Sequence, residues 1–196
     1  ALNHAWDLLN ESGTWEDWLQ CNWPPFESDA EFGPTLVLVA LGELREDTRL
    51  RTRDLVSAKK LSQYLRENPP LSLHAKAMRL WAEIYWPKSM LRSERKAWRE
   101  ELVNAQSDDG GWSMASLSGP AWKRDGGEAQ TTTSESYPTA FATYVLLKTG
   151  STPMTQSFAM VSAGYETTNA RRATGLHALH GEIGNTTSVV PQHPSP

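Results

Sequence analysis

The chain has 196 residues and a formal net charge of −4 at pH 7, enough length for one domain with a hydrophobic core and a balance unsuited to a broad nucleic-acid surface. Its single cysteine, Cys21, excludes an internal disulfide and a cysteine-rich zinc site. The longest uninterrupted apolar run, residues 36–41, is far too short to span a membrane.

The first part of the chain predicts a short helix, a turn-rich segment and a long buried helix. Residues 1–10 have the amphipathic pattern of a short helix, and a polar, Trp-rich stretch follows. Ser28 and Glu31 have the spacing of a capping box, which indicates a helix start. Residues 35–44 are apolar on almost every side, which fits a buried helix or a buried strand. The capping box favours a helix over residues 28–44.

The later segments alternate between two kinds of helix. Residues 52–67 and 91–105 each carry a one-sided apolar stripe, typical of a helix that exposes a polar face. Residues 72–86 and 135–149 are apolar over a wide face, like residues 28–44. This alternation predicts an all-α fold in two layers, with about three inner helices and two to three outer ones.

The chain changes character near its C-terminal end. We expect one helical domain over residues 1–163 and an irregular or disordered tail over residues 164–196, where periodicity is lost. His177 and His180, which have metal-ligating side chains, lie in that tail, but we do not expect them to form a metal site. We expect no metal and no cofactor.

A motif follows the predicted helix 91–105. Residues 106–112 read Gln-x-x-x-Gly-x-Trp, and an incomplete copy over residues 9–15 has Leu9 in place of the glutamine. Together with the alternating helices and the nine tryptophans, this motif resembles the squalene–hopene cyclase superfamily over residues 15–150. The resemblance implies an α/α toroid, in which the glutamine helps to satisfy a helix end while the tryptophan stacks nearby.

The number of inner helices is smaller than a closed toroid needs. The resemblance therefore implies a partial ring, as a fragment of a larger toroid would form. Its open rims would expose apolar side chains, which the remainder of the toroid or a partner chain would cover.

The resemblance also implies an acid site. Class II terpenoid cyclases of this superfamily donate a proton from an Asp-x-Asp-Asp motif at the start of an inner helix. In this chain Glu27 aligns with the first acid, Asp29 with the catalytic middle acid and Ala30 with the last, while Glu31 supplies a neighbouring carboxyl group. The alternative is structural, because Glu31 with Ser28 fits a helix cap and an acid is favourable in a first helical turn.

A cyclase cavity stabilises carbocations on aromatic faces. The residues expected to line such a cavity are Trp23, Phe32, Trp81, Tyr85 and Tyr137. Core packing is the alternative for each of them. Protein prenyltransferases share the toroid but carry Asp-x-Cys-Tyr as zinc ligands, and residues 134–137 retain only the tyrosine, which argues against a zinc prenyltransferase.

Three hypotheses for function follow. The first is a squalene or terpenoid cyclase-like repeat domain, an isomerase if it is an enzyme. It would bind or cyclise a polyprenyl (triterpene) substrate by acid-initiated carbocation chemistry. The second is a non-catalytic toroid module that binds a ligand or a protein, and the third is a carbohydrate-active α/α barrel. The expected partner is an apolar isoprenoid molecule and not a nucleic acid. Peripheral contact with a membrane is compatible with this expectation.

Overall fold

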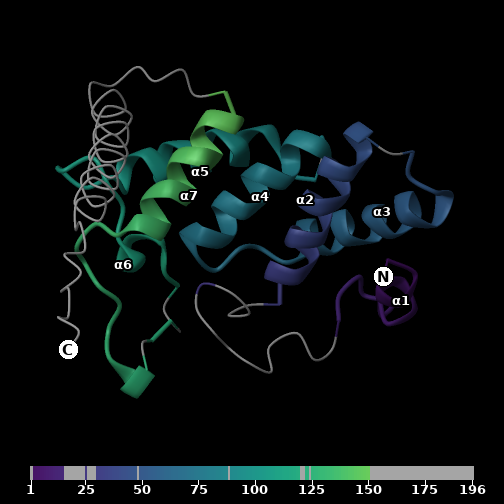
Figure 1. Cartoon of the computed structure of the whole chain (residues 1–196), viewed down its shortest axis with the longest axis horizontal. Helices are drawn as coiled ribbons and strands as arrows, with labels where there is room; N and C mark the ends of the chain where they lie inside the picture. Colours follow the sequence, from purple (N-terminus) through teal and green to yellow (C-terminus); the bar gives the residue numbers. More distant parts are fainter. Residues whose placement is uncertain are drawn as a thin grey trace, which may run out of the picture. The chain divides into compact units, whose positions relative to one another are not determined.

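The computed structural model describes residues 2–15, 25, 30–47, 49–87, 89–119, 122–123 and 125–150 (Figure 1). All of them belong to one compact unit, Ala1–Met154. They form α1 (Leu2–Asp7), α2 (Phe32–Asp47), α3 (Thr52–Glu67), α4 (Leu73–Tyr85), α5 (Arg92–Asn104), α6 (Met114–Leu117), the 3-10 turn η1 (Asp125–Gly127) and α7 (Ser136–Lys148). The described residues contain no strand, which confirms the all-α prediction. The predicted tail, 164–196, lies outside them.

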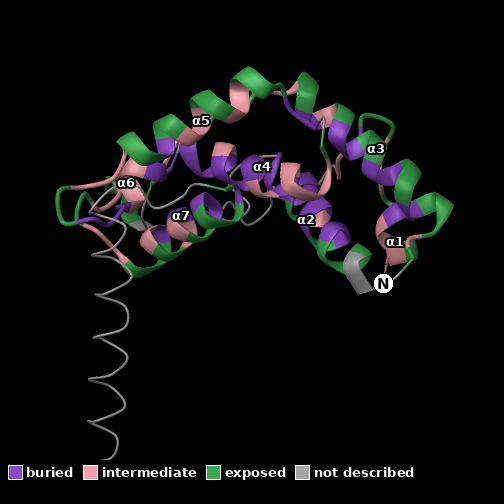
Figure 2. Ribbon diagram, turned by 90° about the horizontal axis from the view of Figure 1, so that it is seen from above, coloured by how far each residue is buried: buried purple, intermediate pink, exposed green. Residues whose placement is uncertain are grey.

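The described helices pack in two layers. In the first layer α4 contacts α2 on one side and α7 on the other. In the second layer α3 packs on α2, and α5 packs on α4. Figure 2 shows the outward sides of α3 and α5 largely exposed, while α4 is mostly buried. The layers agree with the predicted alternation, since the one-sided helices α3 and α5 lie in the second layer and expose their outward sides.

The three helices of the first layer run parallel. The ring of His74, the second residue of α4, contacts Phe32 at the start of α2 and Tyr137 at the start of α7. At the other ends of these helices, the hydroxyl of Tyr85 donates a hydrogen bond to Glu43. The first layer therefore has one edge formed by helix N-termini and an opposite edge formed by helix C-termini.

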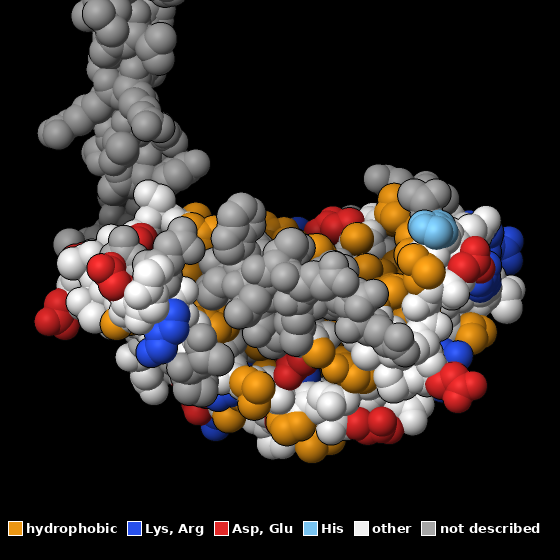
Figure 3. All heavy atoms as spheres, turned by 90° about the horizontal axis from the view of Figure 1, so that it is seen from below, with side chains coloured by type: hydrophobic (Ala, Val, Ile, Leu, Met, Phe, Trp, Pro, Cys, Tyr) orange, Lys and Arg blue, Asp and Glu red, His pale blue; other side chains and the backbone are white. Residues whose placement is uncertain are grey.

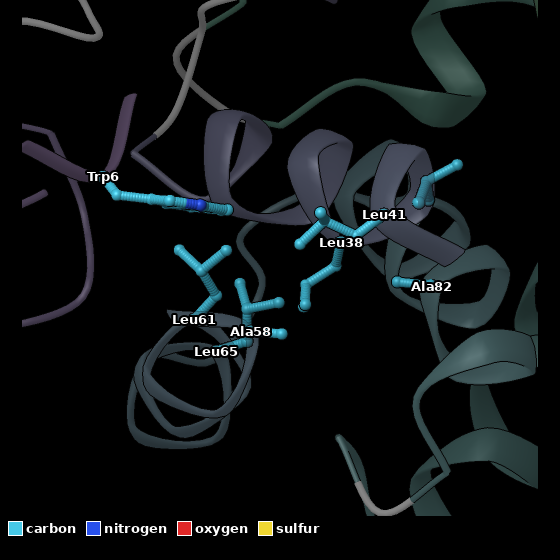
Figure 4. Close-up of a cluster of buried hydrophobic side chains, with 8 residues drawn as sticks. Trp6, Leu38, Leu41, Ala58, Leu61, Leu65 and Ala82 are labelled. Carbon is cyan, nitrogen blue, oxygen red and sulfur yellow. The ribbon is translucent and has the colours of Figure 1, made fainter. Parts of the chain in front are cut away.

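A hydrophobic cluster joins α1, α2, α3 and α4 (Figure 4). Its buried members are Trp6, Leu38, Val39, Leu41, Ala58, Leu61, Leu65 and Ala82. Three of its leucines, Leu38, Leu41 and Leu61, are completely buried. Each such leucine stabilises the fold by about 1.5–3 kcal/mol relative to an exposed one.

Helix α1 and the two helices of the second layer, α3 and α5, share one feature at their C-terminal ends. In α1, α3 and α5, the carbonyl of the third residue from the end accepts a hydrogen bond from a distant side chain. The pairs are Trp15 Nε1 with Ala5 (3.0 Å), Arg79 Nη1 with Leu65, and Trp112 Nε1 with Leu102 (2.8 Å). Each donor satisfies one of the carbonyls that a helix end leaves without an intrahelical partner.

The turns after α1 and α5 repeat each other in detail. In each turn a backbone N–H bonds to the carbonyl four residues later, at 3.0 Å from Asn10 and at 2.8 Å from Ser107. Gly13 and Gly110 have φ values of 88° and 85°, which glycine adopts without the strain of a side chain. The incomplete motif copy thus forms the same turn as the complete one, even though it lacks the glutamine.

Two details of the sequence analysis need correction. Gln106 does not satisfy the end of α5: its Nε2 donates to the Gly110 carbonyl at 2.8 Å and closes the turn, while Trp112 bonds the helix. Helix α2 begins at Phe32 rather than at residue 28, and Glu31 directly precedes it. Pro34 therefore lies within the first turn of α2, where a missing N–H costs no helical hydrogen bond.

Candidate functional site

One face of α4 and α7 carries a continuous set of aromatic side chains and one histidine. On α4 these residues are spaced by seven and four positions, and on α7 by four and three, so each set follows one helix face. We call the set the aromatic row: His74, Trp81 and Tyr85 on α4, and Tyr137, Phe141 and Tyr144 on α7. From His74 to Tyr85 the row extends about 16 Å along α4, at the usual helical rise per residue.

The row begins at the edge formed by helix N-termini, around His74. This side chain is buried, with 1% of its residue surface exposed. Its ring stacks on Phe141 with centroids 4.7 Å apart and lies 5.5 Å from the ring of Trp122. Its Nε2 lies 2.7 Å from the hydroxyl of Tyr137, so a hydrogen bond joins α4 to α7 inside an aromatic surrounding.

Both members of this hydrogen bond are uncharged at neutral pH. Burial lowers the pKa of His74 to about 3, because an imidazolium would lose its hydration among the surrounding rings. Burial also raises the pKa of Tyr137 to about 12, because its phenolate would lose hydration in the same way. The pair is therefore a neutral polar group within an apolar face.

The opposite end of the row has a different electrostatic character. Trp81 meets Tyr144 edge to face at 5.0 Å, and Lys148 Nζ lies 5.7 Å from the centroid of the Tyr144 ring. Burial raises the pKa of Tyr85 to about 12, with a further contribution from its hydrogen-bond acceptor Glu43. Because helix C-termini carry partial negative charge, this end favours cations such as Lys148.

A glycine lets α2 approach the row closely. A Cβ added to Gly42 would lie 2.1 Å from Cγ of Tyr85, far inside van der Waals contact. The Tyr85 ring therefore rests against the backbone of α2. The absence of a side chain at Gly42 fixes the spacing between α2 and α4 at this end.

The row remains partly open to solvent. Tyr137 and Tyr144 each expose 37% of their surface, and Leu147 on the same helix exposes 51%. On the face drawn in Figure 3, hydrophobic side chains are exposed between polar ones. The described part of the chain thus presents apolar surface that an apolar ligand or another chain would bury.

The structure brings together four of the aromatic residues named from the sequence. Phe32 and Tyr137 both contact His74, at 6.2 and 6.1 Å between ring centroids. Trp81 and Tyr85 lie one turn apart on α4, within the aromatic row. Trp23 and the candidate acids Glu27 and Asp29 lie outside the described residues.

Glu31, the remaining candidate acid, forms a buried ion pair. Its Oε2 lies 2.5 Å from Arg79 Nη2, and the two side chains are only 7% and 6% exposed. Arg79 also donates to the carbonyls of Leu65 and Asn68 at the end of α3. Glu31 therefore helps to join α2, α3 and α4, and its participation in proton donation stays a prediction.

Sequence reasoning missed the two residues that organise these contacts, His74 and Arg79. Both are buried ionisable residues on α4, and the other buried residues of this helix are apolar. An ionisable residue inside such a pattern is a usable signal, since a buried polar group needs a partner. The partners themselves, Tyr137 and Glu31, are 63 and 48 positions away in the chain.

Two further properties concern the same described residues. They contain no group of three or more His, Cys, Asp or Glu side chains placed to hold a metal ion. None of the helices seen there is both long enough and apolar enough to cross a bilayer. Comparisons of the chain with family models, with curated proteins and with solved structures give no match.

Proposed function

We propose that the chain is part of a terpenoid cyclase-like α/α toroid and that its aromatic row binds an apolar polyprenyl molecule. The aromatic row carries this proposal, because it extends about 16 Å along α4, includes rings of the adjacent parallel helix α7 and stays partly exposed. Aromatic side chains offer large apolar contact area at little cost in side-chain entropy.

Two features support the toroid. The parallel helices α2, α4 and α7 form one layer. Helix α3 packs on α2 and helix α5 packs on α4 as a second layer, as nested helical pairs would. The glycine-tryptophan turns after α1 and α5 both fasten a tryptophan to a helix end. A repeated fastening of this kind suits a ring built from similar units.

Binding without turnover is the form of the function that the described residues support. Cyclisation would need an acid aimed at the bound chain, and Glu31 is held by Arg79 instead. Acid-initiated cyclisation by Asp29 with Glu27 is the extension of the proposal, and product analysis tests it separately.

Equilibrium dialysis of the full chain against tritiated squalene or the C15 hydrocarbon farnesene tests the proposal. We expect saturable binding, and we expect Trp81→Ala to weaken it roughly tenfold, as loss of a central aromatic contact does. Trp98→Ala on α5 is the control, because Trp98 is similarly half-buried but lies on the second layer. Circular dichroism verifies that both variants fold.

Absence of saturable binding to the folded wild-type chain would refute the proposed function. Equal loss in the Trp81 and Trp98 variants would move the binding surface away from the aromatic row. Gas chromatography of the extracted ligand then distinguishes a cyclase, which releases a cyclic product, from a binding module, which returns the ligand unchanged.

A further inference from the structure

The two end helices of the first layer, α2 and α7, each expose an apolar side. On α2, Leu36 and Leu44 expose 39% and 44% of their surface and lie about two turns apart on the same side of the helix. On α7, Ala140 and Leu147 are both exposed and lie seven positions apart, again on one side. Both ends of the layer therefore present apolar surface of the kind that another chain covers.

The described helices repeat an order that breaks at both ends of the layer. In chain order α2 is followed by α3, which packs on it, and α4 is followed by α5, which packs on it. No described helix packs on α7 in that way. Helix α1 has the glycine-tryptophan turn of α5 but follows no described first-layer helix, and Figures 1 and 2 place it beside α3, on the side of α2 away from α4. One end thus lacks a second-layer helix, and the other end carries an additional one.

A basic hollow lies along α5 on the side of this helix that faces the end of α7. Its volume is about 700 Å³. Arg95 identifies the side, since its Nη2 lies 3.5 Å from the carbonyl oxygen of Thr149 at the end of α7. The described residues that line this α5 hollow include four basic residues, one acidic residue and one apolar residue: Arg92, Arg95, Lys96, Arg99, Glu100 and Val103. The hollow therefore favours an occupant with acidic and apolar side chains.

Helix α1 and its turn have that character. Residues 2–15 contain two acidic residues and no lysine or arginine. One of the acids, Asp7, is already in an ion pair with α3. The other acid, Glu11, is exposed, and Leu8, three positions before it, exposes 59% of its surface. An acidic side chain close to an apolar one matches the basic residues and Val103 of the α5 hollow.

The residues that follow α7 in the same chain do not supply this charge. Residues 151–196 contain two glutamates and two arginines, with no aspartate and no lysine, so their formal net charge is zero. Charge complementarity therefore favours α1 of another copy as the occupant of the α5 hollow.

We propose that copies of this chain associate head to tail. The exposed side of α2 in one copy packs against the exposed side of α7 in the next, which continues the parallel packing of α2, α4 and α7 from one copy to another. Helix α1 of the first copy then lies in the α5 hollow of the second, where a second-layer helix on α7 belongs. Such a contact repeats from copy to copy and forms a ring when the rotation between copies closes. This inference does not depend on ligand binding by the aromatic row.

Sedimentation velocity of the full chain over a range of concentrations tests the association. We expect the mass to rise from one chain to two or more, and we expect high salt to weaken the association, because part of the contact is between charges. Leu147→Glu should weaken it roughly tenfold or more, because it places a carboxylate in an apolar contact. Val56→Glu is the matched control, because Val56 is 53% exposed on α3, a helix outside the proposed contact.

A charge exchange tests the contact between α1 and α5. One variant carries Arg92→Glu with Lys96→Glu, and the other carries Glu11→Lys. Each variant alone should associate more weakly than the wild-type chain, because like charges then meet between α1 and the α5 hollow. An equimolar mixture should regain the association, since every contact between the two variants again joins opposite charges. Circular dichroism verifies that all variants fold.

The outcomes bear on the association and not on the proposed function. The mass of a single chain at every concentration overturns the proposal and leaves residues of the same chain to cover α7. Association that survives Leu147→Glu, or that Val56→Glu weakens equally, overturns the placement of the contact on α7. Failure of the mixture to associate overturns the contact between α1 and α5. Equilibrium dialysis with a prenyl hydrocarbon measures ligand binding separately in each case.

Discussion

At the scale of single residues, the neutral histidine is the feature with the largest measurable consequence. His74 is enclosed by aromatic rings and has its pKa lowered to about 3 by burial. In the unfolded chain the same side chain would titrate near pH 6.5. Because the folded state resists protonation, the unfolded state binds more protons below that pH, and acid favours unfolding.

The first prediction is a loss of stability between pH 6.5 and pH 4.5. The contribution of His74 is fully present above pH 6.5 and falls as the pH decreases toward the folded-state value, by about 1 kcal/mol per pH unit. Urea unfolding at several pH values measures it. His74→Gln should remove this part of the slope, whereas His4→Gln, at an exposed position on α1, should leave it in place.

A buried carboxylic acid, Asp54, sets the lower limit of that pH window. The side-chain hydrogen bond from Arg51 holds the pKa of Asp54 well below its usual range. Stability from Asp54 is therefore present above its unfolded pKa of about 4 and is lost only below it. Equal slopes for wild type and His74→Gln above pH 4.5 would contradict a neutral, buried His74.

At the scale of helices, the ends of α1, α3 and α5 show how side chains can replace missing helical hydrogen bonds. Two tryptophans and one arginine donate to equivalent carbonyls. Trp112 is 1% exposed, so its acceptor on Leu102 would be left buried and without this donor if the indole N–H were removed.

The second prediction follows from that burial. Trp112→Phe should lower the free energy of unfolding by about 2–4 kcal/mol, because it removes both the hydrogen bond and part of a fully buried ring. Trp15→Phe removes the equivalent bond at a half-buried position and should cost less. Chemical denaturation monitored by far-ultraviolet circular dichroism gives both values. Equal costs would show that the burial of the tryptophan does not change how much its hydrogen bond contributes to stability.

The contact between α2 and α4 gives the third prediction. Gly42→Ala should destabilise the chain by about 1–3 kcal/mol, despite the better helix propensity of alanine, because the new methyl group overlaps Tyr85. Ala40→Ser, at an exposed position of the same helix, is the control and should change stability by less than about 0.5 kcal/mol. A neutral or stabilising Gly42→Ala would mean that the two helices are farther apart than described.

At the scale of the whole described unit, the buried ion pair Glu31–Arg79 joins three helices. Arg79 comes from α4, Glu31 precedes α2, and the two carbonyls that Arg79 bonds belong to the end of α3. The pair therefore fixes both layers at one point. A buried pair of this kind is costly to break because the remaining charge stays desolvated.

The fourth prediction concerns this joint. Arg79→Met should destabilise the chain by about 3–5 kcal/mol, since it leaves the Glu31 carboxylate without its guanidinium. The double variant Arg79→Met with Glu31→Gln should recover part of that loss, because no uncompensated charge remains. Thermal unfolding of the three proteins measures the coupling. Additive losses would show that the two residues do not stabilise each other.

The sequence by itself predicted the helical class and most helix positions. Residues 52–67 were expected and found as α3, and α4, α5 and α7 begin and end within one residue of the expected bounds. Apolar periodicity is a local property, so it can be read without knowing what each helix touches. The start of α2 was placed too early from the capping pattern at residues 28–31, and the structure begins the helix at Phe32.

The tertiary structure alone decided how residues distant in sequence share one site. Phe32, Trp81, Tyr85 and Tyr137 were expected near a cavity from their residue types, but their grouping around His74 and along one row required the packing of α2, α4 and α7. Arg79 likewise acquired its role only where three helices meet. Periodicity predicts which face of a helix is buried, whereas the partner of a buried polar group depends on the packing of the neighbouring elements.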